Sequence, residues 1–150
     1  MTDAAPQRAL LLDSDLFFVV KVTETLKHAG YTTRVARRAE EFARELAGEP
    51  PTVALVNTAA RGVDWETAIH AAHVAGVPVV AFGPHVDLDT QAAARKAGAT
   101  RVISNSKLAG DLPAILARML HRIHPNAGDE NEPDDEPDTG AEDADDADDV

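Results

Sequence analysis

The sequence predicts a doubly wound α/β fold, in which a five-stranded parallel sheet carries helices on both faces. Two observations lead to this prediction: short apolar runs typical of buried strands recur along the chain, and a segment with helical spacing follows each of them. Such alternation with short loops favours a parallel sheet with right-handed crossovers. The length of 150 residues suits one domain with a sizeable core.

The first half of this pattern begins with a strand over residues 8–12, whose four consecutive apolar residues indicate burial on both faces. A helix over residues 16–29 follows, with Asp15 as its N-cap and Gly30 as its end. Its inward face is set by residues spaced four apart, namely Phe18, Val22 and Leu26. Residues 31–36 are β-branched and half polar, which is typical of a strand near the sheet edge.

The remaining elements continue the alternation. Strands are expected at residues 52–56, 77–82 and 101–103, and helices at residues 39–46, 64–75, 88–97 and 112–123. Asp111 is the expected cap of the last helix, with Pro113 in the first turn, where its missing N–H has no helical partner. The expected strand order is 2-1-3-4-5.

The net charge of −12 is unevenly distributed. Thirteen of the 26 acidic residues lie between Asp129 and Asp149, with no Lys or Arg among them, whereas residues 1–128 carry 14 basic and 13 acidic residues. We therefore expect a flexible N-terminus (1–7), a nearly neutral domain (8–124) and a disordered acidic tail (125–150). A neutral domain argues against a nucleic-acid partner.

Other function classes are also disfavoured by composition. The chain has no cysteine, which excludes disulfides, thiolate nucleophiles and thiolate metal sites. No apolar run approaches the roughly 20 residues that cross a bilayer, and the N-terminus lacks the pattern of a signal peptide. We expect a cytoplasmic protein with no membrane partner.

Polar residues gather at the ends of four expected strands. In an open parallel sheet these ends face a common crevice, where ligands bind. The residues at this edge are Asp13, Ser14, Asp15, Asn57, Gly83, His85 and Asn105.

At these positions the chain resembles the CheY-like receiver domains of bacterial response regulators, which have a flavodoxin-like fold. Asp13-Ser14-Asp15 falls where receivers have an acidic cluster, and Gly30-Tyr31 where their first helix stops. Three further segments match the third strand and its loop, the fourth strand, and the turn before the fifth: residues 51–57 with Gly62 and Asp64, residues 78–82, and residues 97–99.

The resemblance implies phosphoryl transfer from a histidine kinase to an Asp at the end of strand three, with Mg²⁺ held by the acids after strand one. This chain departs from that pattern at the working positions. The acceptor position is Asn57, whose amide is a far poorer nucleophile than a carboxylate. Gly83 stands at the Ser/Thr position and Asn105 at the Lys position, with Lys107 the nearest lysine.

We therefore predict a stand-alone pseudo-receiver, not an enzyme, that acts in two-component-type signalling through a protein partner and without phosphorylation. Two alternatives stay open: an active phosphorelay receiver with atypical site residues, and a module that binds a metal or small ligand in the same crevice. For the metal, Asp13 and Asp15 are the candidate ligands, with His85 and Asp87 nearby, and Mg²⁺ the candidate ion. The competing interpretation makes Asp15 and Asp87 helix caps.

Two surfaces are candidate contact sites. Phe17 and Val20 are expected to point away from the buried face of the first helix, where they form a candidate interface for a protein partner or a homodimer. A basic concentration follows on and after the second strand: Arg34, Arg37, Arg38 and Arg44. The acidic tail either screens these arginines or only keeps the domain soluble.

Overall fold

The computed structural model describes residues 7–60, 62–84 and 87–123, and within them five strands alternate with five helices. The strands are β1 (Gln7–Leu12), β2 (Tyr31–Ala36), β3 (Val53–Asn57), β4 (Val79–Gly83) and β5 (Arg101–Ser104). The helices are α1 (Leu16–His28), α2 (Ala39–Ala47), α3 (Trp65–Val74), α4 (Leu88–Ala97) and α5 (Asn105–Ile123). His85, the N-terminal residues 1–6 and the acidic tail lie outside the described residues.

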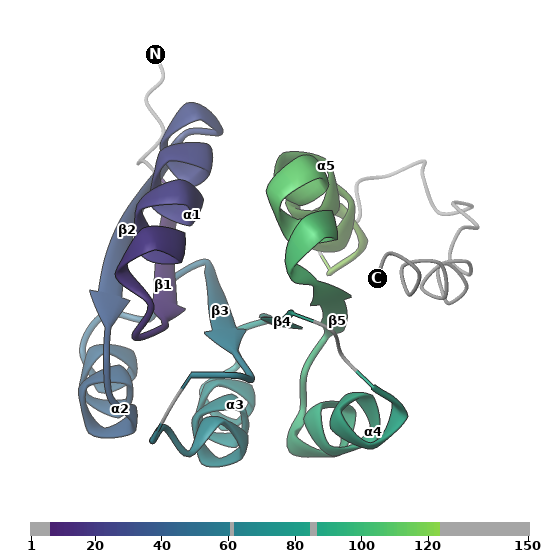
Figure 1. Cartoon of the computed structure of the whole chain (residues 1–150). Helices are drawn as coiled ribbons and strands as arrows, with labels where there is room; N and C mark the ends of the chain where they lie inside the picture. The colour runs from purple at the N-terminus through teal and green to yellow at the C-terminus, as the bar shows by residue number, and fades with distance from the viewer. Residues whose placement is uncertain (1–6, 61, 85–86, 124–150) are drawn as a thin grey trace.

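The strands form one parallel sheet in the order β2-β1-β3-β4-β5, which confirms the predicted fold class and strand order. Helices α1 and α5 cover one face of this sheet, and α2, α3 and α4 cover the other (Figure 1). None of the helices in the described part of the chain is long and apolar enough to span a bilayer.

Strand β1 supplies both cores. Because successive side chains alternate between the faces of a sheet, Ala9 and Leu11 pack towards α1 and α5, whereas Leu10 and Leu12 pack towards α2 and α3. All four are at most 2% exposed. Burying each leucine stabilises the fold by roughly 1.5–3 kcal/mol, so β1 is held firmly in place. This strand begins at Gln7, which pairs with Tyr31.

Helix α1 has the predicted cap and the predicted faces. The carboxylate of Asp15 accepts hydrogen bonds from the backbone N–H groups of Phe17 and Phe18. Gly30 follows the helix with a φ of 92°, a conformation that favours glycine. Val22 and Leu26 are buried, and the opposite side of the helix is exposed.

The predicted start of the last helix is wrong. Helix α5 begins at Asn105, so Asp111 lies within it and is not a cap, and Pro113 lies in the helix interior. The physical reason is a continuous buried face along the helix, made by Leu108, Leu112, Ile115, Leu116 and Met119. Burying these five side chains outweighs the roughly 3 kcal/mol that an interior proline costs.

The other predicted boundaries lie within two residues of the observed ones, and β2 and α4 match at both ends. Strand β4 begins at Val79 rather than at residue 77, after Pro78, which has no N–H to donate to a neighbouring strand. Strand β3 includes Asn57 as its last residue. The side chain of Asn57 is thereby placed by the strand itself, not by the loop that follows.

Candidate functional site

The fold brings the predicted crevice residues to one edge of the sheet. Asp13 follows β1 directly, Asn57 ends β3 and Gly83 ends β4. The register pairs Leu12 with Val56, and Asn57 with Phe82, so these strand ends lie level with one another. Asn105, the first residue of α5, comes directly after β5 at the same edge.

Asp13 and Asn57 form a buried hydrogen-bonded pair at the centre of this edge. Asp13 is 0% exposed and Asn57 6%. The Nδ2 atom of Asn57 donates to Oδ1 of Asp13 at 2.9 Å, and the backbone N–H of Asp15 donates to the same oxygen at 3.0 Å. A carboxamide thus occupies the end of β3 and binds the neighbouring carboxylate.

The orientation of the Asn57 amide is fixed from both sides. Its Oδ1 atom accepts a hydrogen bond of 2.7 Å from the backbone N–H of Ala59, while its Nδ2 atom faces the carboxylate of Asp13. A flipped amide would set an N–H group against the N–H of Ala59 and an oxygen against a carboxylate oxygen. Both polar atoms of Asn57 are therefore engaged in the only arrangement that satisfies them.

Burial makes the charge on Asp13 unfavourable. Desolvation raises the pKa of this carboxyl above its ordinary value, and the hydrogen bonds from the Asp15 backbone and the Asn57 side chain offset part of that rise. The Oδ2 atom of Asp13 is also buried, and it has no hydrogen-bond partner among the described residues. The carboxylate is thus satisfied on one oxygen and unsatisfied on the other.

Among the crevice positions that the structure describes, no further side-chain hydroxyl or amine makes a hydrogen bond to this pair. Gly83 is buried and has no side chain, and Ser104 at the end of β5 accepts a hydrogen bond from the backbone N–H of Lys107. Asn105 is half-buried, with its Oδ1 atom unpartnered among the described residues. The side chain of Lys107 is exposed on α5, and Ser14 is half-buried beside Asp13.

Some of the side-chain oxygens at this edge are already engaged in hydrogen bonds within the chain. Oδ1 of Asp15 is occupied as the cap of α1, and Oδ1 of Asn57 is occupied by Ala59. Asp87 caps α4 by accepting from Thr90, as the competing interpretation predicted. Within residues 7–60, 62–84 and 87–123, no three His, Asp or Glu side chains cluster in a way that could hold a metal ion.

The start of α1 presents an apolar surface next to the crevice. Phe17 is 89% exposed and Val20 62%, as the helical spacing predicted, and Leu16 is exposed beside them. These three residues define the α1 apolar patch. Its proximity to Asp15 places it at the same edge of the sheet as the Asp13–Asn57 pair.

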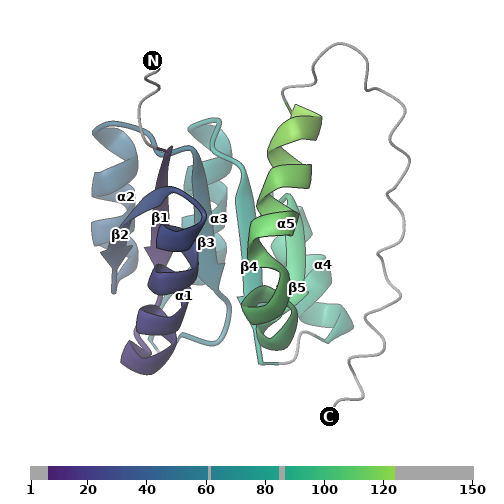
Figure 2. The ribbon, with the colours of Figure 1, turned by 90° about the horizontal axis from the view of Figure 1, so that it is seen from above.

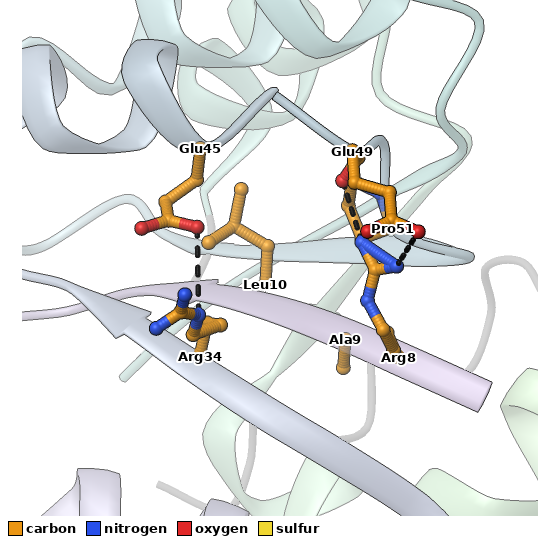
Figure 3. Close-up of a pocket in the computed structure, with 7 residues that line it drawn as sticks. All are labelled: Arg8, Ala9, Leu10, Arg34, Glu45, Glu49 and Pro51. Carbon is orange, nitrogen blue, oxygen red and sulfur yellow. Dashed lines mark hydrogen bonds and ion pairs between the residues drawn. The ribbon is translucent and has the colours of Figure 1, made fainter. Parts of the chain in front are cut away.

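A groove lies at the opposite edge, where the strands begin, and the sequence reasoning missed it. It has a volume of about 480 Å³. We call it the arginine groove after its lining residues, Arg8, Arg34, Arg44, Glu45, Gly48 and Glu49. Figure 3 shows two ion pairs within it: Arg34 with Glu45 at 3.5 Å and Arg8 with Glu49 at 3.4 Å. One pattern in the sequence could have indicated this groove. Arg8 and Glu49 each lie near the start of a buried strand, and the starts of parallel strands share one edge of the sheet.

The predicted basic concentration divides between the two edges. Arg34 and Arg44 line the arginine groove, whereas Arg37 and Arg38 follow the end of β2 at the other edge. Arg38 pairs with Glu40 at 3.8 Å, and the backbone N–H of Arg37 donates to Glu41.

No protein-family model and no curated protein matches the sequence. Solved structures do match in fold. A CheY-like response regulator receiver domain protein from Methanospirillum hungatei aligns at 20% identity with a TM-score of 0.71, over 77% of this chain and 94% of that chain. The signal receiver domain of an HD domain-containing protein from Pseudomonas fluorescens aligns at 21% identity with a TM-score of 0.72, over 83% and 93%.

A third match carries a metal in its own structure. The receiver domain of a sensor histidine kinase from Pseudomonas aeruginosa, solved with a magnesium ion in its active site cleft, aligns at 17% identity with a TM-score of 0.69. The alignment covers 77% of this chain and 98% of that chain. The strand order, the five crossover helices and these matches agree: the chain has the fold of the CheY-like receiver domains of response regulators.

Proposed function

We propose that this protein is a pseudo-receiver, a signalling module of the two-component type that acts through protein contacts and without phosphorylation. The observation that carries the proposal is the carboxamide of Asn57 at the end of β3, hydrogen-bonded to Asp13. Acyl-phosphate formation needs a carboxylate nucleophile, which this position does not offer. Gly83 and Asn105 leave the transferring phosphoryl group without a hydroxyl and without a cation.

The same pair supports an activity that needs no resident metal. In a receiver that uses magnesium, the ion balances the charge of the acidic cluster, whereas here the N–H groups of Asn57 and Asp15 bind the Asp13 carboxylate directly. Signalling in this proposal therefore needs no change of charge at this edge of the sheet, and it depends on the surface that the protein presents to a partner.

That surface is proposed to be the α1 apolar patch, with a signalling protein or a second copy of the chain as its partner. Exposed large apolar side chains that cluster on one helix face are typical of contact sites. Phe17, at 89% exposure, is the most exposed large hydrophobic residue of the described chain.

The proposal is tested by exposing the full-length protein to Mg²⁺ with acetyl phosphate, and separately with beryllofluoride, and measuring intact mass and tryptophan fluorescence. Trp65 is the single tryptophan and opens α3, shortly after Asn57. We expect no added phosphoryl mass and no change in fluorescence. A stoichiometric phosphoryl adduct that is labile to hydroxylamine would identify an active receiver with atypical site residues and contradict the proposal.

A further inference from the structure

The arginine groove keeps binding capacity that its own glutamates do not use. Arg34 meets Glu45 through Nε, and Arg8 meets Glu49 through one terminal nitrogen while also donating to the backbone carbonyls of Glu49 and Pro50. A guanidinium carries five N–H donors in a fork that matches a carboxylate. Arg34 and Arg44 are exposed, so their remaining donors face solvent.

The groove carries three arginines and two glutamates and is thus net positive on a domain that is otherwise close to neutral. It is suited to an extended segment that presents many carboxylates in succession. Such a segment exists in the chain itself: residues 129–149 contain 13 acidic residues and no Lys or Arg.

The end of α5 places this acidic segment within reach. Figure 2 shows the yellow-green end of α5 at the same edge of the sheet as the start of β1, where Arg8 lies. Asp129 follows Ile123 by six residues, which span up to about 20 Å when extended. Helix α5 and helix α2 lie on opposite faces of the sheet, and Arg34 lies on β2, three strand spacings or about 14 Å from β4, so the segment has to pass around the sheet. Residues 124–149 span up to about 85 Å when extended, which is long enough for this path.

We propose that the acidic segment 129–149 binds back onto the arginine groove of its own domain, with its carboxylates on Arg34 and Arg44. Each such pair contributes at most about 1 kcal/mol at an exposed site, so the contact depends on many carboxylates and on the tether. The segment thereby covers the groove against other anions, and a more strongly charged polyanion or high salt displaces it.

The experiment uses the full-length chain, whose lack of cysteine makes site-specific labelling simple. Ala141→Cys places one nitroxide label inside the acidic segment. The signal loss that the label causes at each backbone amide is then measured by NMR in 15N-labelled protein at about 20 mM and about 1 M NaCl, where the Debye length falls to about 3 Å. We expect loss at amides around Arg8, Arg34 and Arg44 at low salt, and recovery at high salt.

A matched pair of charge variants provides the control. In the labelled chain, Arg34→Gln/Arg44→Gln removes two groove arginines and should abolish the low-salt signal loss, whereas Arg37→Gln/Arg38→Gln removes the same charge at the other edge and should retain it. Loss that is absent at low salt, spread over the whole domain, or unchanged in R34Q/R44Q overturns the proposal. A mixture of 14N protein with the nitroxide and 15N protein without it reports only contacts between copies. Loss of the same size in this mixture also overturns the proposal, because the contact then forms between two molecules.

Discussion

The hydrogen bond between Asn57 and Asp13 is the residue-scale feature on which the proposed function rests. A carboxylate at the end of β3 would face a second carboxylate that is 0% exposed, and the two like charges would require a cation between them. The amide removes that requirement because it donates where the acid would repel. One side chain thus changes both the chemistry and the electrostatics of the edge.

Asn57→Asp should destabilise the protein at neutral pH. The variant replaces the donor to Asp13 Oδ1 with a charge, and breaking a buried pair in this way costs about 2–4 kcal/mol. Millimolar Mg²⁺ should restore part of this loss, since a cation balances the charge added beside the Asp13 carboxylate. Urea unfolding at pH 7 with and without Mg²⁺ measures both effects.

The matched control for this substitution is Asn57→Ala, which removes the donor without adding charge. It should lose about 1–3 kcal/mol and show no response to Mg²⁺. If N57D is as stable as the natural chain without Mg²⁺, the buried pair does not have the energetic role described for it.

The raised pKa of Asp13 predicts a pH dependence of stability. Because burial raises this pKa in the folded protein above its ordinary value of 3.8, the folded state holds the proton more tightly than the unfolded chain does. The stabilisation from Asp13 is thus fully present below about pH 3.8 and is lost as the pH rises through the folded pKa. Asp13→Asn removes this titration and keeps the shape of the side chain.

The measurement is urea unfolding of both proteins between pH 4 and pH 7. Relative to D13N, the natural chain should gain stability as the pH falls. Glu41 and Asp64, whose pKa values are lowered mainly by hydrogen bonds from Arg37 and Thr67, are present in both proteins and cancel in the comparison. Parallel pH profiles of the two proteins would show that Asp13 does not titrate differently on folding.

At the scale of the element, helix α1 has two faces with different roles. The buried face stabilises the fold, and the exposed face is the proposed contact surface. Phe17→Ser/Val20→Ser should change the free energy of unfolding by no more than about 0.5 kcal/mol per site, because both side chains are exposed. The same variant should lose capture of a signalling partner, or the dimer if the partner is a second copy. Size-exclusion chromatography measures the loss of the dimer, and a pull-down from the native cell measures the loss of partner capture.

Val22→Ala on the buried face is the control for α1. It should cost roughly 1–3 kcal/mol of stability and leave the contact surface in place. Unchanged oligomeric state and unchanged partner capture in F17S/V20S would remove the α1 apolar patch from the proposed function.

Helix α5 illustrates why element boundaries are harder to predict than elements. Pro113 and Asp111 are strong local signals for a helix start, and they predicted one at residue 112. The buried face that begins at Leu108 is a tertiary effect, since its value depends on β4 and β5 lying beneath it. The local start signals at Asp111 and Pro113 were outweighed by packing against the sheet. This packing involves residues far apart in the sequence, so a short stretch of sequence does not reveal it.

At the scale of the whole molecule, strand identity and order could be predicted because the central strands carry uninterrupted apolar runs, whereas residues 31–36 have the half-polar pattern of an edge strand. Asp13, Asn57 and Gly83 could be assigned to one edge because each ends or directly follows such a run. The direction of the Asn57 amide could not, because it depends on the backbone N–H of Ala59 and on the depth of Asp13. The arginine groove also escaped prediction, since it joins residues from β1, β2 and α2.

Strand β1 carries Arg8 near its beginning and is followed by Asp13 at its other end. Five residues of strand separate the two by about 16 Å, and Asp13 is buried, so a segment seated on the arginine groove does not touch the Asp13–Asn57 pair. The groove can therefore be filled or emptied without breaking the hydrogen bonds at the far end of the strand.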